Sequence, residues 1–341
     1  MPKFGLSQPV ARVEDARFLR GAGRYVEDIH EDGEARAVFV RATVAHADIV
    51  SIDIESARAA PGVLAVLTAD TLDGAINDMD AATLENLDGG VSARPVRPIL
   101  AIGRVRHVGE TVVMVIAETL AQARDAAELV LVEYRDLPVV TDTAGALAPD
   151  APQLHAEAPG NLCMDWGMGD KAATDAAFAG AAHTVSLDLV NNRVIANPME
   201  TRGAIATWDG ERLHLACNGQ GPWGTRDEVA AKLGLKTEQV RVTHPDVGGG
   251  FGMKTFNYPE YLAVAYAAKT LGRPVKWISD RSEGMASDVM GRDHVTRAEA
   301  AFDANHKLTA VRFSTVAGLG AYLSLYAVYI PTVVATKVLT G

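Results

Sequence analysis

The sequence predicts an α+β fold in two parts, and three observations lead to this prediction. Strand and helix patterns are mixed over roughly the first 145 residues. Proline, glycine and alanine then interrupt the pattern, and after them a second mixed region contains a dense glycine cluster. We therefore expect a first α/β domain over residues 1–145, a linker over 146–160 and a second mixed α/β domain over 161–341.

The first domain contains one especially clear segment, residues 111–140. The apolar run at 111–117 predicts a buried strand, Thr119 and Gln122 form the capping-box pair of an alanine-rich helix, and another strand follows at 130–134. This order predicts a βαβ-like unit. Residues 71–98 are polar and predict a long loop. Further β-rich runs and one short helical run complete the domain: strands 35–45, 49–54 and 64–67, and helix 55–60.

The second domain is predicted to be rich in strands, with two helices. One helix is expected to start at a capping box formed by Thr225 and Glu228 and to end at Gly234, and another to run from Pro259 to Gly272. The chain ends in an apolar stretch, which predicts an unfinished domain. The predicted strands are 183–190, 203–208, 212–217, 239–243, 275–279, 294–302 and 308–316.

Composition limits the classes of function. The net charge of −11 and the lack of a Lys/Arg cluster argue against a nucleic-acid partner. The longest strongly apolar run, residues 112–117, is too short for a membrane span, and the first eighteen residues lack the apolar core of a signal peptide. We expect a cytoplasmic protein.

The chain has two cysteines, Cys163 and Cys217. Two thiols cannot supply the four ligands of a structural zinc site or of an iron–sulfur cluster. If the chain takes part in redox chemistry, its electrons must leave through a bound cofactor and another polypeptide. Cys217 itself is expected to be a small core thiol.

The sharpest feature is the segment DVGGGFGMK at 246–254, with four glycines in five positions between a predicted strand and a helix. Such density indicates main-chain amides that approach a ligand, although a tight turn is the alternative. The spacing matches neither a P-loop nor the GxGxxG turn of a dinucleotide-binding fold. Phe251 among the glycines suggests a ring presented to a pocket.

These residues resemble a known family. GGGFGMK is similar to the GGGFGxK signature of the large subunits of the molybdenum hydroxylases, the xanthine dehydrogenase and aldehyde oxidase family. The segment 217–220 resembles the family's glutamine loop, and 197–204 its PMEPRG segment, with Thr201 in place of proline. Most similar is the aerobic carbon monoxide dehydrogenase branch. Further matching segments are 12–29, 107–110, 132–134, 271–277 and 291–294.

The resemblance implies a hammerhead-like first domain and the first part of a molybdopterin-binding second domain. It implies that Gln220 donates to an oxygen ligand of the metal and that Phe251 walls the substrate funnel. Gly249, Gly250, Phe251 and Gly252 would contact the cofactor, with no direct metal ligand from this chain. The cofactor would be molybdenum-molybdopterin in its cytosine dinucleotide form, with iron–sulfur clusters and FAD on partner subunits.

The implied reaction is hydroxylation, with water as the oxygen source, of carbon monoxide, an aldehyde or an N-heterocycle. Thr255 stands where purine-oxidising members carry a glutamate, which disfavours xanthine. Family chains are considerably longer, so this chain is expected to be their N-terminal part, with the catalytic base and most dinucleotide contacts in a missing C-terminal half. The isolated chain is then expected to be inactive. The alternatives are a split chain with a structural or assembly role and a nucleotide-binding α/β protein.

Other candidate residues are expected to be structural. His46, His107 and His294 lie in separate segments without metal-ligand spacing. Glu110 and Glu133 are expected to be solvated or ion-paired carboxylates. If the family assignment is right, Gln220 and Phe251 must lie close together, because both follow predicted strands and would serve one metal centre.

Overall fold

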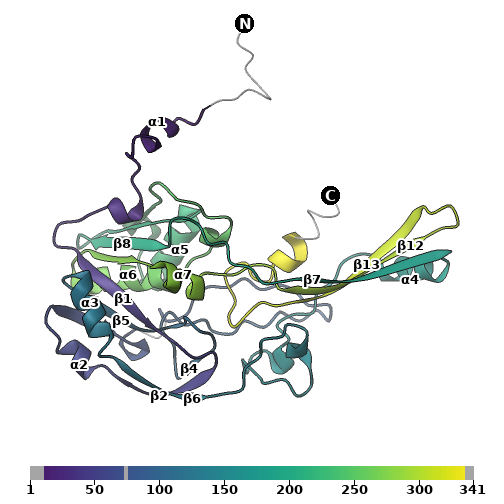
Figure 1. The fold of residues 1–341 in the computed structure, drawn as a ribbon, viewed down its shortest axis with the longest axis horizontal. Coiled ribbons are helices and arrows are strands. Elements are labelled where there is room, and N and C mark those ends of the chain that lie inside the picture. The colour runs from purple at the N-terminus through teal and green to yellow at the C-terminus, as the bar shows by residue number, and fades with distance from the viewer. Residues whose placement is uncertain (1–10, 73–75, 335–341) are drawn as a thin grey trace, which may run out of the picture.

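The computed structural model describes residues 11–72 and 76–334, which form a body and an extended arm (Figure 1). Helices and strands occur in mixed order, which confirms the α+β prediction. The predicted end of the chain, residues 338–341, and residues 1–10 of the N-terminal stretch lie outside the described residues.

A seven-stranded sheet is the centre of the body. Strands from both sides of residues 146–160 build it, since β1 pairs in parallel with β11 through Ala35 and Val275. The two predicted domains therefore share one sheet, and the boundary at 146–160 stays a prediction. In sheet order the strands are β10 (Val240–Thr243), β9 (Leu213–Cys217), β8 (Gly203–Trp208), β11 (Val275–Ile278), β1 (Ala35–Arg41), β5 (Thr111–Ala117) and β3 (Val63–Leu67).

All seven residues of β5 are buried because both faces of the sheet are covered. Met114 and Ile116 pack in the cluster that contains α6 (Pro259–Leu271). Val113 and Val115 pack in a second cluster that contains Ala126 of α3 (Leu120–Ala127). An apolar run without alternation is the pattern expected for a strand buried on both faces.

The predicted βαβ unit is correct in its elements and wrong in its pairing. Thr119 does cap α3 by accepting from the Gln122 N–H. However, the strand after α3, β6 (Leu131–Asp136), leaves the large sheet and pairs antiparallel with β2 (Ala47–Asp53). With β4 (Arg104–Val105) these strands form a separate three-stranded sheet, and α2 (Glu55–Arg58) lies in the connection from β2 to β3.

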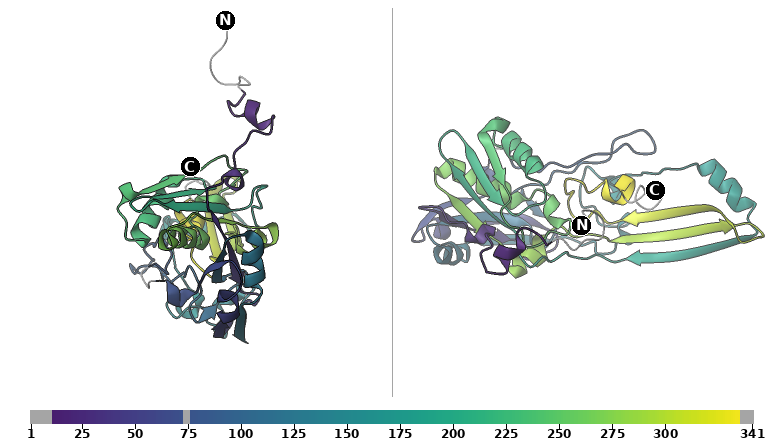
Figure 2. Two further views of the ribbon diagram at one scale, coloured as in Figure 1. Left: turned by 90° about the vertical axis from the view of Figure 1, so that its left-hand side faces the viewer. Right: turned by 90° about the horizontal axis from the view of Figure 1, so that it is seen from above.

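The arm is a third sheet of three long strands that projects from the body (Figure 2). Its central strand is β12 (His294–Phe302), flanked by β7 (His183–Asn191) and β13 (Leu308–Ala317). The helix α4 (Lys171–Ala179) lies along β13, where Phe178 stacks under Arg312. The opposite face, with Val185, Leu187 and Phe313, is exposed.

Two predicted helices are present in the second half of the chain. The predicted start of the first is wrong, and the predicted ends of the second are confirmed. α5 (Pro222–Lys232) starts with proline in its first turn, so Thr225 and Glu228 lie inside the helix instead of forming its predicted capping box. Both are buried, and both bond to Asn257. α6 starts at Pro259, and Gly272 caps it with a left-handed φ of 59°, as predicted.

Two short helices, α1 (Asp15–Phe18) and α7 (Arg281–Ser287), and α4 were not predicted. The described parts of the predicted loop 71–98 contain no α-helix or β-strand beyond an isolated bridge. Within 11–72 and 76–334, every helix is too short or too polar to cross a bilayer. The remaining turns are 3₁₀ segments Val26–Asp28, Ala69–Thr71, Gly145–Leu147, Pro159–Asn161, Thr237–Gln239 and Met253–Thr255, and the π segment Ile330–Val334.

Candidate functional site

The glutamine loop and the glycine turn leave the same edge of the large sheet. β9 and β10 are parallel neighbours, paired from Leu213–Val240 to Ala216–Thr243. The loop at 218–221 follows β9, and the turn at 246–254 follows β10. Carboxyl ends of adjacent parallel strands are a common place for ligand sites in α/β folds, because the loops after them converge.

Gln220 contacts the glycine turn directly, which confirms the predicted proximity. Its side-chain oxygen accepts a 3.0 Å hydrogen bond from the Gly252 N–H, and its backbone N–H donates to the Lys254 carbonyl at 2.9 Å. A Cβ at Gly250 would lie 2.4 Å from the same side-chain oxygen. Any larger residue at 250 would therefore displace the Gln220 amide from this position.

The other glycines have separate causes. Gly249 and Gly252 adopt positive φ angles of 96° and 86°, which side chains rarely tolerate. A Cβ at Gly248 would lie 2.5 Å from the Cβ of Glu200. Phe251 has φ 52°, and its side chain is 77% exposed, so the ring projects outward from the turn.

The amides of the turn divide into two groups. Gly248 donates to Glu200 at 2.8 Å and Gly252 donates to Gln220, so these two amides are already used. No described residue accepts from the N–H groups of Gly249, Gly250 or Phe251. Three successive amides without an acceptor suit an oxygen-bearing or anionic ligand. Because the Gly252 amide is bonded to Gln220, the predicted contact of Gly252 with the cofactor stays a prediction.

Glu200 and Lys254 are further residues of the site, and neither was predicted from the sequence. The Lys254 ammonium donates to Glu200 Oε2 and to the Glu200 carbonyl, each at 2.9 Å, and its side chain is fully buried. The sequence did contain a sign of them, since both fall inside the family-like segments 197–204 and 246–254.

Asp246, at the start of the turn, is held by the N-terminal segment. Arg17 pairs with both of its carboxylate oxygens, and the Arg24 N–H donates to it at 2.7 Å. The hydrogen bonds from Arg17 lower the pKa of Asp246 to about 2. His244 lies against Gly219, and burial lowers the pKa of its imidazole.

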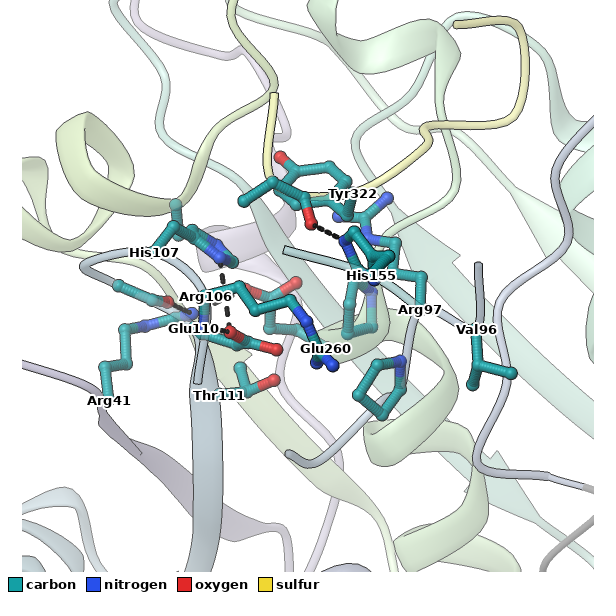
Figure 3. A pocket seen from close by; sticks show the side chains of 15 residues that line it. Arg41, Val96, Arg97, Arg106, His107, Glu110, Thr111, His155, Glu260 and Tyr322 are labelled. Carbon is teal, nitrogen blue, oxygen red and sulfur yellow. Dashed lines mark hydrogen bonds and ion pairs between the residues drawn. The ribbon is translucent and has the colours of Figure 1, made fainter. Parts of the chain in front are cut away.

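A separate pocket lies where the first and second regions meet, and no residue of the glycine turn lines it (Figure 3). Arg41 of β1 enters it and pairs with Glu260 and Glu283, each at 2.6 Å. Glu260 also pairs with the fully buried Arg202 at 2.8 Å. These ion pairs fasten β1 to α6 and α7, and we assign this pocket no part in the glycine-turn site.

Glu110 and His46 were both predicted to be structural residues and not catalytic or metal-binding ones. Glu110, which lines the same pocket, is buried and accepts from the Arg106 N–H, and His107 with this backbone bond lowers its pKa against the opposing effect of burial. Glu110 is thus partnered, as expected, though not solvated. His46 Nδ1 donates to the Pro138 carbonyl at 2.7 Å, and His46 lies far from His107 in the chain.

Comparisons with known proteins show which family this chain resembles. Residues 20–138 match the family model "Aldehyde oxidase and xanthine dehydrogenase, a/b hammerhead domain", and residues 154–340 match "Molybdopterin cofactor-binding domain". The carbon monoxide dehydrogenase large chain of Hydrogenophaga pseudoflava is 39% identical over 332 residues, which are 93% of this chain and 40% of that protein. The nicotine 6-hydroxylase large subunit of Paenarthrobacter nicotinovorans is 36% identical, with 93% and 38% covered.

Solved structures give the same result. The reconstituted CO dehydrogenase from Oligotropha carboxidovorans superposes with a TM-score of 0.82 at 35% identity, covering 91% of this chain and 39% of that one. Quinoline 2-oxidoreductase from Pseudomonas putida 86 superposes with a TM-score of 0.79 at 35% identity, with 90% and 38% covered. The chain spans about 40% of the length of the relatives it matches.

Proposed function

This chain belongs to the molybdopterin cofactor-binding family of the aldehyde oxidase and xanthine dehydrogenase large subunits, and on that premise we propose that its glycine turn holds a molybdenum cofactor for a hydroxylase. The carrying observation is the contact between Gln220 and Gly252. Because the amide oxygen of Gln220 is occupied, its NH₂ group is the end left to donate. This NH₂ group has no acceptor among the described residues, and together with three amides that also lack acceptors it fits a cofactor that carries oxygen atoms.

In this proposal each residue has a defined task. The Gln220 NH₂ donates to an oxygen atom of the cofactor, and the Gly249 and Gly250 amides lie against it. Gly252 orients Gln220, and the exposed Phe251 ring forms a wall of the path by which substrate enters. A preorganised donor of this kind stabilises charge that develops during reaction. When bound, the cofactor would supply the redox chemistry of a hydroxylation that takes its oxygen from water.

Electron transfer is assigned to partner subunits. Burial raises the pKa of Cys163 to about 11 and that of Cys217 to about 12, so both thiols stay protonated at neutral pH. Protonated thiols are poor ligands for iron or zinc. We therefore assign the iron–sulfur clusters to separate polypeptides. The similarity to carbon monoxide dehydrogenase large chains supports the further proposals that FAD lies on a partner subunit and that the cofactor is the cytosine dinucleotide form.

The substrate is proposed to be carbon monoxide, an aldehyde or an N-heterocycle, with Thr255 disfavouring purines. The catalytic base and the dinucleotide contacts are assigned to polypeptide equivalent to the remaining 60% or so of the relatives' length. The protein would act in the cytoplasm as one part of this complex.

The test is metal analysis of the protein purified from its own host, with and without the products of neighbouring genes. We expect stoichiometric molybdenum and substrate-dependent dye reduction only in the assembled complex. Molybdenum that is absent from the complex as well would favour the alternative, a structural or assembly role without activity. Stoichiometric metal in this chain alone would overturn the assignment of the dinucleotide contacts to another polypeptide, and dye reduction by this chain alone would overturn that of the base.

A further inference from the structure

The first glycine of the turn, Gly248, and its last residue, Lys254, are both attached to one residue, Glu200. At the first end, the Gly248 N–H donates to Glu200 Oε2 at 2.8 Å, and the Glu200 N–H donates to the Gly248 carbonyl at 3.1 Å. At the far end, the Lys254 ammonium donates to the same carboxylate oxygen and to the Glu200 carbonyl. One residue therefore closes residues 248–254 of the turn into a loop.

Glu200 can hold the turn because its own segment is anchored to the core. Arg281 donates to the carbonyls of Pro198 and Met199 at 2.8 and 2.7 Å. On the other side, the Thr201 hydroxyl donates to the Ser279 carbonyl at 2.6 Å, next to the fully buried Arg202. The segment before β8 is thus a fixed platform under the turn.

Lys254 connects the Glu200 segment to the glutamine loop. Its ammonium is bound to Glu200, while its backbone carbonyl accepts from the Gln220 N–H at 2.9 Å. Gly252, two residues earlier, donates to the Gln220 side chain. A shift of Lys254 must therefore move both groups that hold Gln220.

The charges of this pair depend on each other. Glu200 Oε1 is buried without a hydrogen-bond partner among the described residues, so its carboxylate is stabilised only through Oε2. Burial lowers the pKa of Lys254, opposed by the attraction of Glu200. Removing one partner leaves the other as an uncompensated buried charge, which is strongly unfavourable.

We propose that Glu200 and Lys254 are positioning residues that together set the orientation of the Gln220 amide through the glycine turn. The chemical role of that orientation rests on the proposed function. The structural connection from Glu200 and Lys254 to Gln220 does not. Neither residue is placed in contact with substrate or cofactor.

Hydrogen–deuterium exchange of the full 341-residue chain, resolved to single amides, tests the link. In Glu200→Ala we expect the Gly248 and Gly252 amides both to exchange about tenfold faster, the change that follows from losing one hydrogen bond. In Lys254→Met the Gly252 amide should become faster while Gly248 keeps its acceptor and its protection. Glu200→Gln, which keeps an oxygen at the same place, should restore protection of Gly248.

Glu283→Gln is the matched control. Glu283 is 15% exposed and loses an ion pair with Arg41, while Glu200 is 16% exposed and loses one with Lys254. Glu283→Gln should leave the exchange of the turn unchanged while lowering the thermal midpoint.

The proposal is overturned if Glu200→Ala and Lys254→Met leave the Gly252 amide as protected as in the wild type, or if Glu283→Gln exposes the turn equally. If Glu200→Ala does not fold, Lys254→Met alone decides, because in that variant the Gly252 amide should exchange faster while the Gly248 amide stays protected. None of these measurements needs molybdenum. Failure of the metal test therefore leaves the positioning result standing, and failure here leaves the metal result standing.

Discussion

The side-chain oxygen of Gln220 accepts a hydrogen bond of 3.0 Å from the backbone N–H of Gly252. An amide has two unlike ends, and this bond decides which end faces out of the turn. The oxygen is turned inward, so the residue presents two N–H donors to whatever lies beside the glycines. The predicted importance of Gln220 follows from that orientation.

Replacing Gln220 by alanine should lower the turnover number of the assembled enzyme by on the order of tenfold to a hundredfold, because one preorganised donor that is not the base is lost. Steady-state dye reduction with the enzyme's own substrate measures this. Gln239→Ala removes a surface amide that bonds only to its own turn and to the Glu211 carbonyl, and it should leave turnover unchanged. Equal turnover in Gln220→Ala and the wild type would contradict the assignment.

Gly250→Val should prevent incorporation of the cofactor and destabilise the chain by about 1–3 kcal/mol, the usual penalty for overpacking. The new Cβ would lie 2.4 Å from the Gln220 side-chain oxygen, so the glutamine must move. Molybdenum content and urea unfolding report the two effects. Gly221→Ala is the control, since Gly221 has an extended φ of 178° and open space around it. Full metal content in Gly250→Val would refute the prediction.

Arg202→Met should lower the free energy of unfolding by about 3–5 kcal/mol, because it removes the cation that two buried carboxylates share and leaves Glu260 with only Arg41. Arg202 is fully buried and pairs with Glu260 and Asp288. Denaturant unfolding followed by circular dichroism measures the change. The exposed pair of Arg297 with Asp188 supplies the comparison, and Arg297→Ala should change stability by less than about 1 kcal/mol. A similar small effect for Arg202→Met would show that the buried pairs contribute little.

Acid should release the N-terminal segment from the glycine turn. Arg17 lowers the pKa of Asp246 from 3.8 to about 2, so the carboxylate favours the docked form above pH 3.8. That contribution is lost as pH falls from 3.8 towards 2, when Asp246 becomes protonated. Hydrogen exchange of residues 12–24, corrected for intrinsic rates, should rise in this window. Asp246→Asn should show high exchange at every pH, and a wild-type-like profile in that variant would contradict the prediction.

The secondary structure was predictable where periodicity and end signals agree. The Pro259 start and Gly272 stop of α6 are local features, and the structure reproduces both. Pairing was not predictable for β5 and β6, because no local pattern states that consecutive strands join different sheets. At α5 two local signals compete. A proline in the first turn defines the start, and the box-like Thr225 and Glu228 serve instead as buried partners of Asn257.

Gln220 and the glycine turn were predictable from the sequence, whereas Glu200 and Lys254 were not. Glycine density and the family-like glutamine segment led to Gln220 beside the turn, and the contact with Gly252 confirms this proximity. Glu200 and Lys254 were missed because they are 54 positions apart and carry charges that normally indicate a solvated surface. Their burial depends on three-dimensional packing, which a single sequence does not reveal.

The projecting arm has a consequence for how this polypeptide behaves at high concentration. β7 and β13 are its outer strands, nine and ten residues long, and each therefore has one side facing away from the ladder. Long outer strands with exposed apolar side chains act as templates for strand addition between molecules. Val190 and Phe313 are 74% and 65% exposed on these strands. Self-association through the arm, sheet edge to sheet edge, is the expected route by which the chain aggregates when it is produced alone.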